Sequence, residues 1–444
     1  MAGRQMPNTI STKRARIAAL AKQMPEEAIR SLSHHVDLDW MAEAYRRTRK
    51  DGAVGVDGVT AADFAADLEA NLQSLIDRAK SGSYRAPPVR RVEIPKGKGK
   101  TRPIGIPTFE DKILQRAVHM VLEPLYEQDF YDFSYGFRPG RSAHDAVDAV
   151  RDVIHSLDGG WVLDADVASF FDTLDHKQLR DLLRRRVADG VVVRLIGKWL
   201  NAGVMIDGSM EHLGVGTPQG GVISPLLANI YLHEVLDRWW VEDVLPRLRG
   251  RAALVRYADD FVMIFARKDD AERVLEILVR RFERFGLTLH PEKTRLVSFA
   301  HPSAGGDYKP GTFDLLGFTV YWGRTRAGGY SVKTRTASSR LNRTINAIYE
   351  WLKAHRHDSI PLQAAAIGRV LRGHDEYFGT PGNYRQLATL RQAVTRLWQH
   401  ALARRSQRGL SWRRFKAILR RHPLPKARIR RKGRKQMKLG LANV

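Results

Sequence analysis

The two adjacent carboxylates Asp259 and Asp260 are the residues whose type and spacing point most directly to chemistry. They lie between two short apolar runs, residues 254–255 and 261–265, and such runs predict buried strands. The simplest arrangement is a tight hairpin with both acids at its tip. Like charges about 4 Å apart repel by roughly 4 kcal/mol, and divalent cations such as Mg²⁺ relieve that repulsion through oxygen ligands. The alternative is a solvated turn without a metal.

A further carboxylate lies upstream, in a segment that alternates as a strand does. Residues 161–167 place apolar side chains on one predicted face and Asp164 and Asp166 on the other. If Asp166 lay beside the predicted hairpin, the chain would hold three carboxylates in one cluster. Such a cluster can bind two cations, which clamp the attacking and leaving oxygens of a phosphoryl transfer. These acids therefore predict polymerase or nuclease chemistry.

The composition narrows the class of protein that positions these acids. The chain has 444 residues, 43% of them hydrophobic, a formal charge of +26 and no cysteine. This length fits two to four domains, and the charge predicts a polyanionic partner such as nucleic acid. The absence of cysteine excludes disulfides and thiolate zinc sites. We find no transmembrane run and no signal-peptide core, so we expect a cytoplasmic protein without a membrane partner.

Apolar spacing and turn residues predict the elements around the acids. Residues 1–50 are expected to form a basic helical lead, which is either a nucleic-acid-binding extension or a solvated helix. Glu376 is the last acidic residue, and basic residues are densest at 404–438, which predicts a nucleic-acid-binding tail. The other expected elements are helices at 61–80, 111–123 and 271–285, strands at 89–94, 101–106 and 287–289, a helix with Ser224 as N-cap, and helices from residue 339 onward.

The sequence resembles the bacterial group II intron reverse transcriptase/maturase family in five blocks that follow the family order. One block, Tyr257-Ala258-Asp259-Asp260, is similar to the signature hairpin of reverse transcriptases. The others are SYGFRPGRS at 134–142, residues 166–176, TPQGGVISPLLAN at 217–229 and FDLLGF at 313–318. The resemblance is strong over residues 54–320 and weaker in the region that follows.

The resemblance implies an α+β right-hand polymerase, with fingers and palm around an antiparallel sheet, a helical thumb and a basic C-terminal segment. The implied domains are an N-terminal extension at 1–60, fingers and palm at 61–335, the thumb at 336–403 and the tail at 404–444. Two Mg²⁺ ions, for which Mn²⁺ can substitute, are implied as cofactors. The implied catalytic residues are Asp166, Asp259 and Asp260, and the implied metal ligands are these three and Val167.

The resemblance also implies sites for the incoming nucleotide and for nucleic acid. The nucleotide-binding residues are Lys96, Arg102, Phe171, Gln219 and Lys293, and the nucleic-acid-binding residues are Arg138, Arg141, Tyr257 and Gly317.

The residues themselves leave alternatives open at several of these positions. Lys96 and Arg102 lie on a predicted hairpin and could neutralise a triphosphate, or the hairpin could be basic and exposed without a ligand. A bulky ring at Phe171 would clash with a 2′-hydroxyl and favour deoxynucleotides, but either Phe170 or Phe171 must belong to the core. The 136–142 loop could grip a template strand or simply pack, and Lys293 could be a surface lysine.

We therefore expect an RNA-directed DNA polymerase of the group II intron type. Its expected partners are an RNA template, a DNA or RNA primer and a structured intron RNA whose splicing and mobility it aids. One alternative is a domesticated relative with the same chemistry, serving phage defence or DNA repair. Another is an RNA-splicing chaperone without polymerase activity, which the presence of all three carboxylates disfavours.

Overall fold

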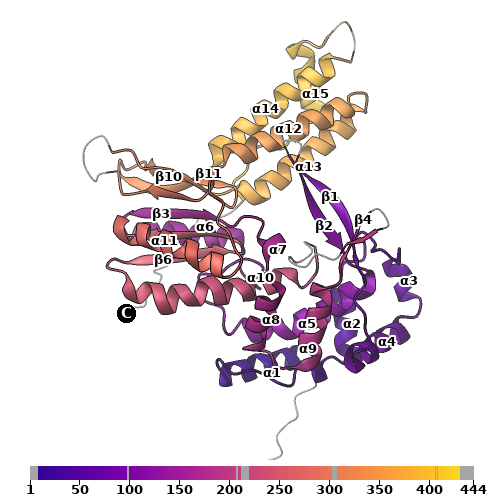
Figure 1. Ribbon diagram of the computed structural model, residues 1–444. Coiled ribbons are helices and arrows are strands. Elements are labelled where there is room, and N and C mark those ends of the chain that lie inside the picture. The colour runs from indigo at the N-terminus through magenta and orange to yellow at the C-terminus, as the bar shows by residue number, and fades with distance from the viewer. Residues whose placement is uncertain are drawn as a thin grey trace, which may run out of the picture. The chain divides into compact units, whose positions relative to one another are not determined.

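The computed structural model describes residues 9–97, 100–206, 209–211, 220–302, 308–405, 407 and 409–430. The chain forms two compact units that do not follow chain order (Figure 1). The first unit comprises Met1–Ala146, Ala165–Met263 and Asp269–Arg295, and the second comprises Val147–Asp164, Ile264–Lys268 and Leu296–Val444. The four consecutive domains expected above remain a prediction.

The N-terminal part of the first unit is helical, and its helices begin at side-chain caps. Thr9, Asp37 and Thr60 each accept a hydrogen bond from the first turn of a helix, as N-cap residues do. The expected helices at 1–50 and 61–80 are each interrupted, because Met24 and Asp67 leave helical geometry. The helices are α1 (Ile10–Gln23), η1 (Ser33–His35), α2 (Leu38–Arg47), α3 (Ala61–Ala65), α4 (Leu68–Ser81) and α5 (Phe109–Tyr126).

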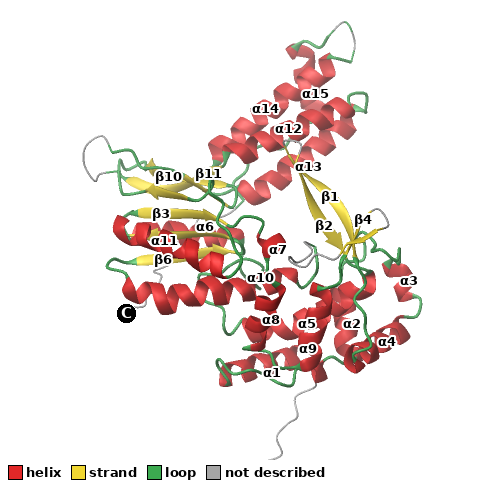
Figure 2. Ribbon diagram, in the orientation of Figure 1, coloured by secondary structure: helices red, strands yellow, loops and turns green. Residues whose placement is uncertain are grey.

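A basic hairpin follows α4, as the sequence predicts. Strands β1 (Val89–Gly97) and β2 (Lys100–Ile106) pair antiparallel, with Ile94 opposite Arg102. Two short strands, β4 (Val204–Ile206) and β5 (Ser209–Glu211), extend this sheet in the order β2-β1-β4-β5. Figure 2 shows the long β1–β2 hairpin among helices. The hairpin positions Arg102 on a strand.

The predicted acids lie on neighbouring strands of a second sheet, which has the order β6-β7-β3-β8. Its strands are β3 (Trp161–Asp166), β6 (Ala252–Tyr257), β7 (Asp260–Phe265) and β8 (Arg295–Ser298). The division into units passes along β3 and β7, and all three acids belong to the first unit. Because β3 and β7 are adjacent, Asp166 and Asp260 come from neighbouring strands.

Helices connect these strands. They are α6 (Ala143–Ser156), α7 (Phe170–Thr173), α8 (His176–Arg184), α9 (Gly190–Leu200), α10 (Ser224–Leu232), η2 (His233–Asp237), η3 (Trp240–Val244), η4 (Leu245–Arg247) and α11 (Lys268–Arg284). The prediction of Ser224 as N-cap is wrong by one position. Ile223 is the cap, Ser224 is the first helical residue, and Pro225 lies in the first turn. The expected strand at 287–289 is reduced to one bridge between Val167 and Leu289.

The second unit contains a small sheet and a group of helices. Strands β9 (Phe313–Leu315), β10 (Phe318–Arg324) and β11 (Tyr330–Thr336) pair in the order β11-β10-β9. Helices α12 (Ser338–Ala354), α13 (Ile360–Phe378), α14 (Tyr384–Ala403) and α15 (Trp412–Arg421) follow. Trp398 and Phe415 lie in their shared core, so part of the predicted basic tail is a packed helix. Within the described residues, none of the helices is both long and apolar enough to cross a membrane.

Candidate active site

The β6–β7 hairpin confirms the predicted geometry of the acidic pair. Ala258 and Asp259 form the two-residue turn, and Asp260 begins β7. Ala258 has a φ of 57°, an uncommon conformation for a residue other than glycine. The five residues after Asp260 are buried, so the apolar part of β7 anchors the hairpin while the carboxylates occupy its tip.

Arg256, the residue before Tyr257, stabilises the hairpin through buried hydrogen bonds. Its guanidinium is fully buried and donates to the Asp237 carboxylate, at 2.5 Å from Oδ2. The same group donates to Oδ1 of Asn229 at 2.9 Å and to the carbonyl oxygen of Ala258 at 3.1 Å. Buried charges are tolerated when they are paired and hydrogen-bonded in this way. Arg256 thus connects the turn to the segment that contains α10 and η2.

A second support comes from residues 133–136. The Tyr135 N–H donates to the Arg256 carbonyl oxygen at 2.8 Å, and Asn229 Nδ2 donates to the Gly136 carbonyl oxygen at 2.6 Å. A Cβ atom at Gly136 would lie 2.3 Å from the backbone nitrogen of Ala258, so only glycine fits. Close contact with the hairpin turn therefore explains the glycine at position 136 of the SYGFRPGRS block.

Asp166 at the end of β3 lies beside Lys293. The Lys293 ammonium donates to Asp166 Oδ2 at 2.5 Å, and the His290 N–H donates to the Asp166 carbonyl oxygen at 2.8 Å. The sequence predicted both residues as site residues without predicting this contact. The Val167 side chain is apolar and 5% exposed, so only its carbonyl oxygen could serve as a metal ligand.

The electrostatics of Asp259 connect the two acidic segments. Burial raises the pKa of Asp259, the Asp166 charge raises it further, and the Arg102 charge opposes both. Asp166 and the predicted nucleotide-binding Arg102 therefore both act electrostatically on Asp259. Among the described residues, however, no group of three or more His, Asp or Glu side chains is arranged to hold a metal. The cluster of three carboxylates remains a prediction.

The other predicted nucleotide-binding residues fall into two groups. Phe170 is 2% exposed and belongs to the core, whereas Phe171 is half-buried, with the two rings 5.3 Å apart. This division agrees with the expectation that Phe171 is the outward ring. The side chain of Lys96 and the whole of Gln219 lie outside the described residues.

Arg138 does not suit the template contact predicted for it. Its side chain is 3% exposed and pairs with Glu127 at 3.0 Å. It also donates to the carbonyl oxygens of Tyr131 at 2.6 Å and Ser134 at 2.8 Å. Because these donors are satisfied within the protein, Arg138 shapes the loop that supports the hairpin. The sequence could not separate this role from template binding, since both require an arginine in the same loop.

The remaining predicted nucleic-acid-binding residues lie in or next to turns. Arg141 donates to the exposed Asp132 carboxylate at 2.6 Å. Tyr257 is half-buried, with its ring 6.4 Å from that of Phe137, which is 56% exposed. In the second unit, Gly317 has a φ of 83° in the turn between β9 and β10. These positions leave nucleic-acid contact as a prediction.

The sequence patterns did not predict the support formed by Arg256, Asp237 and Asn229. Asp237 and Asn229 lie 19 and 27 residues from Arg256 in the sequence, so helix or strand periodicity could not pair them with it. One signal was present, because Arg256 is a charged residue inside an otherwise apolar strand. A buried position next to the acids could have indicated that it needs a carboxylate partner.

Comparison with known proteins identifies the family of the chain. Residues 94–320, about half of the chain, match the family described as reverse transcriptase (RNA-dependent DNA polymerase). The chain therefore belongs to the reverse transcriptase family.

Its relatives include a group II intron-encoded protein. Protein YkfC of Escherichia coli (strain K12) is 40% identical over 287 residues, covering 57% of this chain and 75% of that protein. Group II intron-encoded protein LtrA of Lactococcus lactis subsp. cremoris is 43% identical over 173 residues, covering 38% of this chain and 28% of LtrA. An uncharacterised 91 kDa protein in the cob intron of Schizosaccharomyces pombe is 39% identical over 165 residues, covering 37% of this chain and 20% of that protein. The match thus spans most of YkfC but only a minor part of the two intron proteins.

Proposed function

We propose that this protein copies RNA into DNA by adding deoxynucleotides to a primer 3′-hydroxyl, as a group II intron reverse transcriptase. The observation that carries the proposal is the contact of Lys293 with Asp166, whose charge also acts on Asp259, in a chain that belongs to this family. Residues 61–335 supply the fingers and palm and residues 336–403 the thumb of a right-hand polymerase.

The donor chemistry of the acids fits a divalent cation. Asp166 and Asp259 offer oxygen ligands, and they are close enough that the Asp166 charge raises the pKa of Asp259. Such ligands suit Mg²⁺ or Mn²⁺. We assign the ligands as Asp166, Asp259, Asp260 and the Val167 carbonyl oxygen. When bound, a pair of cations stabilises the attacking and leaving oxygens of the transfer.

The surrounding residues bind and orient the nucleotide. Arg102 places a positive charge near Asp259, where it can neutralise the triphosphate together with Lys96. Lys293 pairs with Asp166 through a 57% exposed side chain, so it can exchange this partner for the departing pyrophosphate and donate a proton to it. The half-buried Phe171 selects deoxynucleotides by excluding a 2′-hydroxyl.

A structured intron RNA is the second proposed partner. The chain carries a formal charge of +26, and its LtrA relative is named for a group II intron. On α15, Arg413, Arg414 and Lys416 are exposed, so their cations are available to phosphates. We propose that the protein binds such an RNA and aids its splicing and mobility.

Primer extension tests the polymerase proposal. Purified protein is given poly(rA)/oligo(dT) with Mg²⁺ and either dTTP or UTP, in parallel with Asp259→Asn. We expect extension with dTTP, little with UTP and none in the variant. Lack of extension by the wild-type protein, together with intact intron RNA binding, would favour the splicing chaperone instead. A role in defence or repair would show as extension without affinity for intron RNA.

A further inference from the structure

We propose that the first unit carries a second nucleotide-binding site, in a basic cavity formed by α8, α9 and the segment before β1. The cavity has a volume of about 910 Å³ and fifteen lining residues. None of these is among the catalytic, nucleotide-binding or nucleic-acid-binding residues assigned above. Its size falls within the usual range of small-molecule sites, about 300–1,000 Å³.

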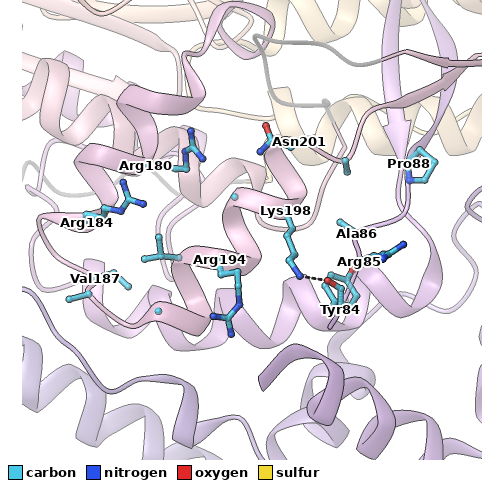
Figure 3. Close-up of a pocket in the computed structure, with 15 residues that line it drawn as sticks. Tyr84, Arg85, Ala86, Pro88, Arg180, Arg184, Val187, Arg194, Lys198 and Asn201 are labelled. Carbon is cyan, nitrogen blue, oxygen red and sulfur yellow. Dashed lines mark hydrogen bonds between the residues drawn. The ribbon is translucent and has the colours of Figure 1, made fainter. Parts of the chain in front are cut away.

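The charge of the cavity indicates a phosphate-bearing ligand. Five lining residues are cations and none is acidic, the cations being Arg85, Arg180, Arg184, Arg194 and Lys198. Figure 3 shows Arg180 and Arg184 on one side of Lys198 and Arg194, with Ala86 and Pro88 on the other. Cations gathered on a concave surface repel one another unless an anion neutralises them, and phosphate is an anion that arginine binds through paired donors.

Not all of these cations are equally available. Lys198 donates to the carbonyl oxygen of Gly82 at 2.6 Å and also to that of Tyr84, so it fixes the cavity wall. Arg194 donates to the Lys80 carbonyl oxygen at 3.3 Å. Within the described residues, Arg180 donates from its Nε alone, to the His176 carbonyl oxygen at 3.2 Å, which leaves its two terminal nitrogens for a ligand.

Arg184 also remains available, because its partner is exposed. It pairs with Asp181 at 3.3 Å, and the two side chains are 58% and 57% exposed. Such exposed pairs contribute little to stability, so Arg184 can exchange Asp181 for a phosphate. Arg180 and Arg184 are one helical turn apart on α8, so their guanidinium groups lie on the same face.

The apolar part of the wall argues for a nucleotide rather than a simple anion. Ala86, Pro88, Val187 and Val193 line the cavity, and they can contact a base or sugar while the arginines bind its phosphate. A phosphate alone would leave these residues and most of the 910 Å³ without contacts. The ligand is therefore a phosphorylated nucleotide, either free or as an unstacked unit of an RNA strand.

Gly197 offers a test that changes shape without changing charge. It lines the cavity from α9, and a Cβ atom there would have Arg180 Cδ at 3.8 Å as its nearest neighbour, an ordinary contact. Gly197→Leu should therefore fold and project into the cavity. Leucine is also a better helix former than glycine. Gly373→Leu is the matched control, because Gly373 lies in α13 with open space around it.

The experiment is photo-cross-linking of the full chain in EDTA, with labelled peptides mapped by mass spectrometry. One probe is 8-azido-ATP, and the other is a hexaribonucleotide that contains 4-thiouridine. We expect cross-links within residues 84–88 or 180–202, with yields reduced about tenfold in Arg180→Ser/Arg184→Ser, as for the loss of one or two charge-assisted bonds. Gly197→Leu should reduce them similarly.

The controls separate a local site from general charge. Arg46→Ser/Arg247→Ser removes two cations whose side chains are 68% and 72% exposed elsewhere in the unit, and it should retain the cross-links, as should Gly373→Leu. Labelling by 8-azido-ATP identifies a free nucleotide, and labelling by the RNA alone identifies a strand. No cross-link in these segments, or an unchanged yield in Gly197→Leu, would overturn the site even if primer extension succeeds.

Discussion

Arginines around the acidic hairpin are buried and paired with carboxylates, whereas cations on the helix α15 are exposed. Around the hairpin, Arg256 and Arg138 have side chains that are 0% and 3% exposed, and each pairs with a carboxylate. On α15, Arg413 and Arg414 are exposed, and no acidic residue follows Glu376. The difference teaches that the number of cations does not identify a binding surface. Burial and pairing decide which arginines build the site and which remain for phosphate.

The last two acids of the chain, Asp375 and Glu376, also form structural contacts within the second unit. Asp375 accepts from Arg391 at 2.6 Å and from the Arg428 N–H at 3.2 Å, and Glu376 pairs with Arg430 at 3.0 Å. These contacts hold the segment after α15 against α13. The cations of α15 thus have neither these acids nor any later one as partners, which sharpens the contrast with the hairpin.

The largest expected effect comes from the acid that the hairpin presents. Asp259→Asn should lower primer extension by roughly a thousandfold or more, because it removes a metal-binding charge where transition-state charge develops. Its thermal midpoint should be unchanged or higher, since burial raises the pKa of Asp259 and so opposes the charged form. Extension assays and thermal unfolding on the same preparation check both expectations. Retained extension would show that Asp259 is not catalytic.

The buried arginine should matter for stability as well. Asp237→Asn leaves Arg256 without its carboxylate partner in a fully buried position, and breaking such a pair costs about 3–5 kcal/mol. Urea unfolding measures this loss in the free energy of unfolding. The control is Asp243→Asn, whose partner Arg247 is 72% exposed, with an expected cost below about 1 kcal/mol. If both variants lost the same free energy of unfolding, buried arginines that stabilise the site could not be distinguished from exposed arginines in this way.

Asp111 supplies a third case, a buried acid that pairs with no cation in the described structure. It accepts from the Tyr84 hydroxyl at 2.6 Å and from Gln115 Nε2 at 3.0 Å. Burial raises the pKa of Asp111 from 3.8 to about 6. The folded protein therefore keeps a proton that the unfolded chain releases between these pH values, and stability falls as the pH rises through this range.

A comparison with Asp111→Asn isolates that effect. The variant does not titrate, so the wild type should lose about 3 kcal/mol relative to it between pH 4 and pH 6, and no more above pH 6. Urea unfolding at several pH values measures the difference. The asparagine also loses one hydrogen bond, which shifts the difference by a constant and leaves its pH dependence intact. A flat difference would show that Asp111 is charged throughout.

These cases show what the sequence could and could not predict. The hairpin acids and the β1–β2 hairpin follow from local spacing, which the sequence contains, whereas the choice of Phe171 over Phe170 as the outward ring came from the family resemblance. The roles of Arg138 and Arg256 depend on partners brought together by folding, such as Glu127 and Asp237. The contact between Lys293 and Asp166 joins residues 127 positions apart. The family resemblance implied that both are site residues, but neither it nor local spacing predicted their contact.

The smallest effect on stability is expected for the exposed cations of α15. Changing Arg413, Arg414 and Lys416 to serine should alter the free energy of unfolding by less than about 0.5 kcal/mol for each position, because all three are exposed. RNA affinity should fall, and the slope of log affinity against log salt concentration should become shallower by up to about 2, since each phosphate contact in single strands contributes about 0.7. Titrations of RNA binding at several salt concentrations measure the slope, with Phe415, buried between these residues, left intact. An unchanged slope would place the phosphate contacts on other cations and weaken the contrast between α15 and the hairpin.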